Sequence, residues 1–396
     1  MVFARRVEGR KGERSSGTWS PTHRRERPIG VSLSEKALKR HSFASPVSSD
    51  RMSETSRYDR QMRLPMIGQA GQDRLRSGRV AVLGCGALGT VAADILARAG
   101  VGYLRVIDRD VVEWTNLQRQ SLFLEADAAA GRAKAEVACQ RLEGANSAIR
   151  VEPVVADVTV DTIAAVLEGI DLVIDAADNF AIRFLLNDYS LKHRIPWVHG
   201  GCVGTSGQVM FFDGRGKPCF RCLVPSMPPP SAIATCDTAG VLGSATHAIA
   251  SLQATEAIKW LSGHPDAVRR RVWSFDFWGN RNREIEIPAA LWESCPACAN
   301  GEFSFLDGAA TGGDTEAKVL CGRRAVQLPP PTVAASLEIL AKRWADLGRI
   351  DASRFFVRLH LPEEITITVF RDGRAVVEGT DEIAKAKSLH ARYVGG

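Results

Sequence analysis

Three glycines and one carboxylate in the first half of the chain have the types and spacing of a nucleotide-binding site. Gly84, Gly86 and Gly89 form a Gly-x-Gly-x-x-Gly pattern, which lets the backbone turn tightly and approach a phosphate closely. Asp108 follows about twenty residues later, where a carboxylate can accept hydrogen bonds from ribose hydroxyls. The chain is therefore predicted to bind an adenine nucleotide, and this pattern alone favours NAD or FAD over ATP.

The polar and basic side chains beyond Asp108 reverse that preference. Asn116, Arg119 and Lys134 crowd the segment that follows the predicted ribose carboxylate. A nicotinamide-dependent oxidoreductase has little use for such a cluster. An enzyme that attacks the α-phosphate of ATP needs it, because negative charge builds on the phosphate oxygens and must be met by fixed donors. These residues favour ATP chemistry, with hydride transfer as the alternative.

Two Cys-x-x-Cys pairs supply a second kind of chemistry. Cys219 with Cys222, and Cys295 with Cys298, each have the spacing of half of a tetrahedral zinc site. Four thiolates would close the site and leave no open position for catalysis, so the predicted Zn²⁺ is structural. A single such pair could be a redox centre. Two pairs, among nine cysteines in a chain with no apparent export signal, favour the metal.

The elements that position these residues follow from the hydrophobic pattern. The apolar runs 80–83, 103–107 and 171–175 predict buried parallel strands, and apolar residues at helical spacing over 88–96 predict a helix after the first. Ligands of doubly wound α/β sheets bind at the carboxyl edge of such strands. Asp178 follows the third strand and could hold Mg²⁺ there, or could instead cap the next helix.

The order of the motifs resembles that of a known family. The segments concerned are Arg-Tyr-Asp-Arg-Gln at 57–61, the glycine pattern, Asp-x-Asp at 108–110, Asn-Leu-Gln-Arg-Gln at 116–120, Gly-x-x-Lys at 131–134 and Asp-Ala-Ala-Asp-Asn at 175–179. Together they look like the MoeB/ThiF family, the bacterial relatives of ubiquitin-activating enzymes, over about residues 56–300. The resemblance implies a Rossmann-like doubly wound α/β sheet with a structural zinc site made of four cysteines.

The same resemblance implies an adenylyltransferase that uses ATP and Mg²⁺. It would activate the C-terminal glycine of a ubiquitin-like sulfur-carrier protein of the ThiS or MoaD type, for sulfur transfer in thiamin or molybdopterin cofactor biosynthesis. These two pathways share every motif quoted above. Adenylation of another ubiquitin-like or peptide C-terminus, and a noncatalytic carrier-binding scaffold, are the alternatives. A sulfur donor such as a cysteine desulfurase is a further expected partner.

Individual roles follow residue by residue from the resemblance. The residues expected to bind nucleotide and metal are Gly84, Gly86, Gly89, Asp108 for ribose, Asn116, Arg119 and Lys134 for the phosphates, and Asp178 for Mg²⁺. Arg60 resembles an arginine that reaches across a homodimer to the γ-phosphate, so a homodimer is expected. The family also has the four zinc cysteines at the same places.

One further cysteine resembles a reactive position. Cys236 matches the residue proposed in the family to take up the carrier's activated carboxyl or its sulfur, and a loop thiol near helix N–H groups would be partly thiolate. A small buried hydrophobic role is the alternative. The chain departs from the family just beyond it, because Gly243-Ser244 stands where relatives usually have Ala-Pro or Gly-Pro.

Composition bounds the rest. The net charge of +6 is concentrated in residues 1–51, so it does not indicate nucleic-acid binding by the folded part. No apolar run approaches the ~18 residues of a membrane helix, and we expect a cytoplasmic location. Residues 1–51 are predicted to be a disordered basic tail, with Met52 as the translation start or, alternatively, with the tail as an interaction arm.

The remaining boundaries divide the folded chain in two. Residues 52–306 are predicted to form the adenylation domain, 307–319 a linker, and 320–396 a small α+β C-terminal domain. In the latter we expect helices over 334–347 and 381–392 and strands over 355–361, 364–370 and 374–377. The terminal Gly395-Gly396 resembles the end of a sulfur carrier, but it follows a predicted helix directly, so self-adenylation is not expected.

Overall fold

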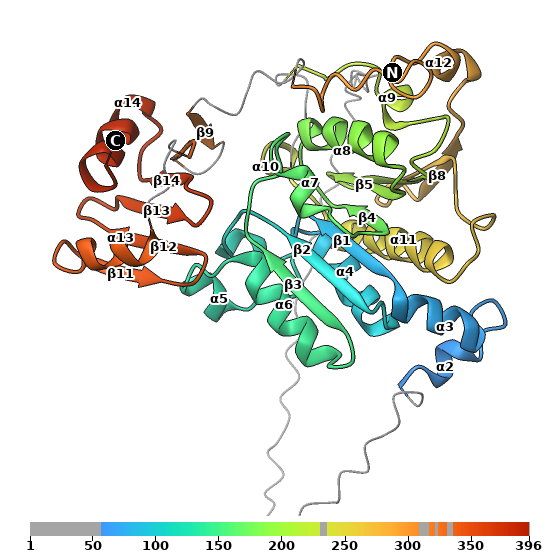
Figure 1. Cartoon of the computed structure of the whole chain (residues 1–396), viewed down its shortest axis with the longest axis horizontal. Coiled ribbons are helices and arrows are strands. Elements are labelled where there is room, and N and C mark those ends of the chain that lie inside the picture. The colour runs from blue at the N-terminus through green and yellow to red at the C-terminus, as the bar shows by residue number, and fades with distance from the viewer. Residues whose placement is uncertain (1–56, 230–235, 309–316, 321–323, 331–335, 396) are drawn as a thin grey trace, which may run out of the picture. The chain divides into compact units, whose positions relative to one another are not determined.

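The computed structural model describes residues 57–229, 236–308, 317–320, 324–330 and 336–395 (Figure 1). The predicted tail 1–51, most of the predicted linker 307–319 and Gly396 lie outside these residues. Arg51–Gly396 form one compact unit. No helix in the described part of the chain is long and apolar enough to cross a membrane.

A mixed eight-stranded sheet forms the larger part of this unit. Its spatial order is β3 (Arg150–Val154), β2 (Tyr103–Ile107), β1 (Arg79–Leu83), β4 (Leu172–Asp175), β5 (Trp197–Val203), β6 (Ser206–Phe212), β7 (Val272–Asp276) and β8 (Arg281–Ile285). The first five strands are parallel and the last three pair antiparallel. The predicted Rossmann-like α/β sheet is confirmed, with an antiparallel extension that the sequence did not indicate.

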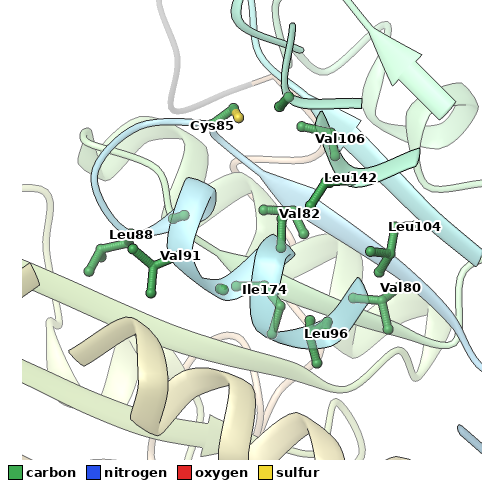
Figure 2. Packing of buried hydrophobic residues seen from close by; sticks show 14 of the residues in the cluster. Val80, Val82, Cys85, Leu88, Val91, Leu96, Leu104, Val106, Leu142 and Ile174 are labelled. Atoms are coloured by element: carbon green, nitrogen blue, oxygen red, sulfur yellow. The ribbon is translucent and has the colours of Figure 1, made fainter. Parts of the chain in front are cut away.

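Helices cover both faces of this sheet, as the alternation of side chains along a strand requires. Val80 and Val82 of β1 pack with α3 (Gly68–Ser77), α4 (Gly89–Ala99), α6 (Lys134–Ala145) and α11 (Gly243–Leu261) (Figure 2). Ala81 and Leu83 point to the other face, where α7 (Ile163–Val166), α8 (Phe180–His193), α9 (Phe220–Leu223) and α12 (Ala289–Glu293) lie. Buried on both faces, β1 carries no polar side chain between its first residue and the glycine loop.

The register of the parallel strands decides where the site lies. Leu83 of β1 pairs with Ile107 of β2 and with Asp175 of β4, so the three strands end at the same level. The glycine loop, Asp108 and the residues after Asp175 therefore leave the sheet side by side. This edge is the expected ligand-binding edge of a doubly wound sheet.

A second sheet follows in the chain. It is antiparallel throughout, in the order β11 (Arg349–Ala352), β12 (Phe356–His360), β13 (Thr366–Phe370), β14 (Ala375–Glu378), β10 (Ala325–Leu328) and β9 (Lys318–Leu320). Helices α13 (Leu337–Trp344) and α14 (Ile383–Tyr393) cover one face around Val357, Ile367 and Trp344. Phe356 and Phe370, on the opposite face, join the core of the larger sheet.

Candidate active site

The glycine loop is shaped by close backbone contacts. Gly84 has a φ of +92°, and a Cβ at this position would lie 2.6 Å from the carbonyl oxygen of Ala176, in the loop after β4. A Cβ on Gly89, the first residue of α4, would overlap the carbonyl oxygen of Gly84. Gly86 is open except for the Gln120 amide nitrogen, 3.9 Å from an ideal Cβ. The loop can therefore admit a phosphate at Gly86, beside an α4 N-terminus that no side chain caps.

Asp108 is fixed at the end of β2 by the glycine loop itself. Its Oδ2 accepts a hydrogen bond of 2.7 Å from the Cys85 backbone N–H, and its Oδ1 accepts one of 2.7 Å from Asp110 N–H. Burial raises the pKa of Asp108, while the nearby Lys134 ammonium lowers it. Each carboxylate oxygen keeps a second lone pair, so Asp108 remains able to accept a ribose hydroxyl.

Lys134 is the first residue of α6, and its ammonium group lies near the Asp108 carboxylate. Its side chain is only 6% exposed, and Nζ is 3.5 Å from Asp110 Oδ2. A buried ammonium beside carboxylates, at the mouth of a glycine loop, is a fixed cation where nucleotide phosphates would arrive.

The phosphate segment, by which we mean residues 109–134 between β2 and α6, carries the other two predicted phosphate residues. Asn116 ends the 3₁₀ helix η1 (Trp114–Asn116), is buried, and accepts a hydrogen bond of 3.0 Å from Glu113 N–H. Arg119 is half-exposed, and its guanidinium donates to the Thr115 carbonyl over 2.7 Å. Short helix α5 (Glu125–Ala129) completes the segment before the chain returns to Lys134. Asn116 thus shapes the segment, and Arg119 is the more accessible of the two.

Asp178 is exposed at the carboxyl edge of β4 and does not cap α8. The N-cap is Asn179, whose side-chain oxygen accepts a hydrogen bond of 3.0 Å from Ile182 N–H. Asn179 Nδ2 also donates to Asp178 Oδ1 over 3.1 Å. Across the edge, the carboxylates of Asp157, Asp110 and Asp178 raise the pKa of Arg109 although burial lowers it. Because the capping role falls to Asn179, the Asp178 carboxylate is available for a cation.

A buried ionic network lies directly beneath Asp178. Asp175, the last residue of β4, is fully buried, and its Oδ2 lies 2.8 Å from His199 Nδ1 and 3.3 Å from Arg183 Nε. The Arg183 guanidinium also donates to the carbonyls of Ala177 and Gly200 over 2.7 and 3.2 Å. Asp175 Oδ1 accepts from Ala177 N–H over 3.1 Å. Both sides of the Ala177 peptide are therefore held, and Asp178 follows it.

The four predicted zinc cysteines come together at one point. Their sulfur atoms lie within 4.8 Å of one another, and three of the four residues are buried. The Sγ–Sγ distances are 3.8 Å for Cys219 and Cys222, 3.7 Å for Cys219 and Cys295, and 3.5 Å for Cys222 and Cys298. A tetrahedron with metal–sulfur bonds of about 2.3 Å has edges of about 3.8 Å. The cluster can hold a metal ion without rearrangement.

The structure leaves the predicted roles of two catalytic residues untested. Arg60 is exposed on α2 (Asp59–Met62), which packs where β2 begins, since Gln61 Nε2 donates to the Ala99 carbonyl at the end of α4. Cys236 begins α10 (Cys236–Ala239), and its side chain lies outside what the structure describes. The chain after α10 pairs at Val241 with Gly204 of the β5–β6 turn.

Helix α11 begins at Gly243, close to the phosphate segment. A Cβ on Gly243 would lie 3.1 Å from the Gln118 carbonyl, so helix α11 begins directly against the phosphate segment. His247 is bonded within the same helix through Nδ1 to the Gly243 carbonyl over 2.8 Å. The backbone that follows Cys236 thus reaches the neighbourhood of Arg119.

Sequence reasoning missed several residues of the site. Gln120 is 4% exposed, lies over Gly86, and leaves its Oε1 buried without a hydrogen-bond partner among the described residues. Its place in the Asn-Leu-Gln-Arg-Gln segment was the only signal. The Arg183 and His199 contacts to Asp175 had no sequence signal, because they join residues from β4, α8 and β5 that only the fold brings together.

Comparison with known proteins decides the family. A model of the ThiF family matches residues 58–297 of this chain. The chain belongs to the ThiF family. It is 39% identical over 343 residues to the sulfur carrier protein ThiS adenylyltransferase of Bacillus subtilis, which covers 86% of this chain and 100% of that protein.

Other relatives in this family have different lengths. The SAMP-activating enzyme E1 of Haloferax volcanii is 40% identical over 251 residues, which is 63% of this chain and 91% of that protein. The adenylyltransferase and sulfurtransferase MOCS3 of Anopheles gambiae is 41% identical over 264 residues, but the chain spans only 59% of it. Among solved structures, E. coli MccB aligns over 63% of this chain and 73% of its own with a TM-score of 0.55 and 23% identity, which supports the fold.

Proposed function

We propose that this ThiF-family chain is an adenylyltransferase that activates the C-terminal glycine of a ubiquitin-like sulfur-carrier protein. The carrier carboxylate attacks the α-phosphorus of ATP, the bond from that phosphorus to the bridging oxygen breaks, and pyrophosphate leaves. The product is an acyl adenylate, in which a poor electrophile has gained a good leaving group. A sulfur nucleophile, supplied by a donor such as a cysteine desulfurase, can then displace AMP.

One observation carries this proposal: the buried Lys134 ammonium lies beside the half-buried Asp108 carboxylate at the mouth of the glycine loop. Asp108 would hold the ribose and the open face of Gly86 the phosphates. Lys134 would meet the negative charge that grows on the phosphate oxygens, helped by Arg119, while Asn116 keeps the segment in shape. A hydride-transfer enzyme would have no use for this cation, which leaves nicotinamide chemistry unsupported.

Two metal ions would assist different parts of the protein. Mg²⁺ at Asp178 would neutralise phosphate charge and orient the departing pyrophosphate. Zn²⁺ would bind Cys219, Cys222, Cys295 and Cys298 and join the region after β6 to the region after α12, without contact with substrate. The Sγ–Sγ distances support a tetrahedral thiolate site.

The carrier is proposed to be of the ThiS type rather than the MoaD type. The Bacillus subtilis relative named for ThiS matches over its whole length, including sequence beyond the ThiF-family region. Arg60 would serve the γ-phosphate of a second copy, which fits its exposed position away from its own site, so we propose a homodimer. Cys236 would accept the activated carboxyl or its sulfur. The cytoplasm is the proposed location.

Exchange of labelled pyrophosphate into ATP tests the proposal. The full chain is incubated with ATP, Mg²⁺ and one candidate carrier at a time, alongside a no-carrier control and the Lys134→Ala variant. Exchange that needs a carrier ending in Gly-Gly and disappears in the variant supports adenylation. Absence of exchange with ThiS-type, MoaD-type and other ubiquitin-like carriers would reject it, and exchange with a MoaD-type carrier alone would reject the carrier assignment.

A further inference from the structure

The phosphate segment is closed at its base by its own two arms. Val112 N–H donates to the Arg132 carbonyl over 2.8 Å, and Lys134 N–H donates to the Asp110 carbonyl over 2.9 Å. Val111 and Ala133 form the antiparallel bridge between these bonds. Where this base lies therefore determines where the Lys134 ammonium lies relative to the glycine loop.

The second sheet contacts each arm of that base through a buried arginine. Arg358 of β12 donates through Nη2 to the Gly131 carbonyl over 3.2 Å, on the returning arm. Arg374, just before β14, donates through Nη2 to the Arg109 carbonyl, on the outgoing arm. The two arginines are 7% and 3% exposed. Two cations from one sheet face thus hold two backbone carbonyls at either side of the segment.

Each arginine is itself held in place by its own sheet. Arg358 Nε donates to Thr368 Oγ1 over 3.0 Å, and Arg374 Nε donates to Asp372 Oδ2 over 2.9 Å. The Arg374 guanidinium lies 3.8 Å from the centre of the Phe370 ring. Neither guanidinium is free to follow a displaced segment, so the contact fixes the segment rather than merely covering it.

Further side chains of the second sheet contact the larger sheet and its helices around these two arginines. Phe356 and Phe370 are buried in the core of the larger sheet, and Arg354 Nε lies 3.8 Å from Glu136 Oε1 on the first turn of α6. Gly131 has a φ of +52°, and a Cβ on it would collide with the Arg358 guanidinium. The second sheet therefore fits the returning arm closely, two residues before Ala133 and three before Lys134.

The comparisons indicate that this sheet is an addition to the adenylating part. The ThiF-family match ends at residue 297, and the Haloferax volcanii relative is 91% spanned by a match of 251 residues. The match to the Bacillus subtilis relative covers 343 residues of this chain and so must extend past 297. In the described part of this sheet, the hydrogen bonds to the phosphate segment come from Arg358 and Arg374 and go to backbone carbonyls rather than to Asp108 or the glycine loop. We therefore expect the sheet to act on the position of the segment rather than on the reaction.

We propose that Arg358 and Arg374 are positioning residues that hold the phosphate segment, before ATP binds, in the position that it occupies when ATP is bound. This inference rests on the proposed adenylation. In its simplest consequence, loss of the two arginines leaves the segment in its binding-competent position for only a fraction of the time. The apparent affinity for ATP falls by that fraction, and bound ATP restores the position.

The test compares Arg358→Ala/Arg374→Ala with the full wild-type chain in two measurements. Carrier-dependent pyrophosphate exchange should show a KM for ATP raised by about tenfold, with kcat and the KM for the carrier within about twofold of wild type. Hydrogen exchange of backbone amides in residues 109–134 should become faster without ATP and return toward wild type with Mg²⁺ and ATP. Arg392→Ala, an exposed arginine on α14, is the matched control and should change neither measurement.

Either of two results would overturn the proposal: amide exchange in the phosphate segment equal to that of Arg392→Ala, or a loss of kcat with an unchanged KM for ATP. If the alanine variant does not fold by circular dichroism, Arg358→Lys and Arg374→Lys take its place, because lysine keeps the charge but not the two-armed donor. Failure of the proposed function is distinguishable, since the wild type would then show no pyrophosphate exchange while amide exchange still reports on the segment.

Discussion

Replacement of Arg183 by methionine tests the buried network beneath Asp178. Methionine keeps an apolar stem but removes the ion pair to Asp175 and the two hydrogen bonds to the carbonyls of Ala177 and Gly200. Breaking a buried pair by removal of one partner costs about 3–5 kcal/mol, because the remaining charge stays buried. We expect Arg183→Met to lower the unfolding free energy by about 3 kcal/mol at pH 8 and Tm by roughly 4 °C.

The effect should depend on pH through His199. Burial lowers the pKa of His199 below 6.5, and the Arg183 charge lowers it further although Asp175 opposes this. A base whose pKa is lowered by folding loses stability as pH falls through 6.5, because the unfolded chain takes up a proton that the folded chain refuses. In the variant without Arg183, the unfolding free energy falls less on acidification, because His199 can be protonated beside the Asp175 carboxylate. The difference in unfolding free energy between the wild type and Arg183→Met should therefore be smaller at pH 5.5 than at pH 8.

Urea unfolding at both pH values measures the two predictions. Arg98→Met is the matched control, because Arg98 pairs with Asp94 over 2.9 Å at a site where its side chain is 62% exposed, and its loss should cost under about 1 kcal/mol. The double variant Arg183→Met/Asp175→Asn should recover part of the loss by removing the unpaired charge. A cost for Arg183→Met no larger than that of Arg98→Met, or a difference that widens at acidic pH, would refute the reasoning.

Further predictions concern the site residues. Lys134→Ala should lower the rate of pyrophosphate exchange by about 10²–10³-fold, and an unaltered rate would remove Lys134 from the mechanism. Gly89→Ala should abolish ATP binding in calorimetry, because its Cβ would overlap the carbonyl of the first glycine. Asp178→Asn should raise the Mg²⁺ concentration needed for half-maximal exchange; equal Mg²⁺ curves would argue against a metal at this residue. Cys298→Ser should lose bound metal by elemental analysis, whereas Cys139→Ser, at a buried cysteine outside the cluster, should retain it.

The parts that the sequence predicted are those encoded by local pattern. The run 80–83, the glycine pattern and the helix after it specify strand, turn and helix within about twenty residues, and all three are present. The same holds for the two C-terminal helices and for the strands near 355–361, 364–370 and 374–377.

The parts that escaped prediction depend on contacts between distant residues. Strands β7 and β8 were not predicted, and β8 is exposed along its whole length, so no apolar alternation marks it. Strands β9, β10 and β11 are only 3–4 residues long, too short for a periodic signal. The arginines at 358 and 374 and the Asp175 network likewise become meaningful only when the sheets are assembled. Arg60 and Cys236 keep their predicted roles as proposals, since neither side chain is placed at the site.

The most direct test of carrier adenylation is to determine which phosphorus of ATP is transferred to the carrier. The full chain is incubated with a ThiS-type carrier and ATP labelled at either the α- or the γ-phosphorus, and the carrier is then isolated under acid conditions. Adenylation predicts label on the carrier from the α-position alone, and none on a carrier that lacks its last glycine. Label from the γ-position, or no transfer of α-label to any carrier with a terminal Gly-Gly, would contradict the account.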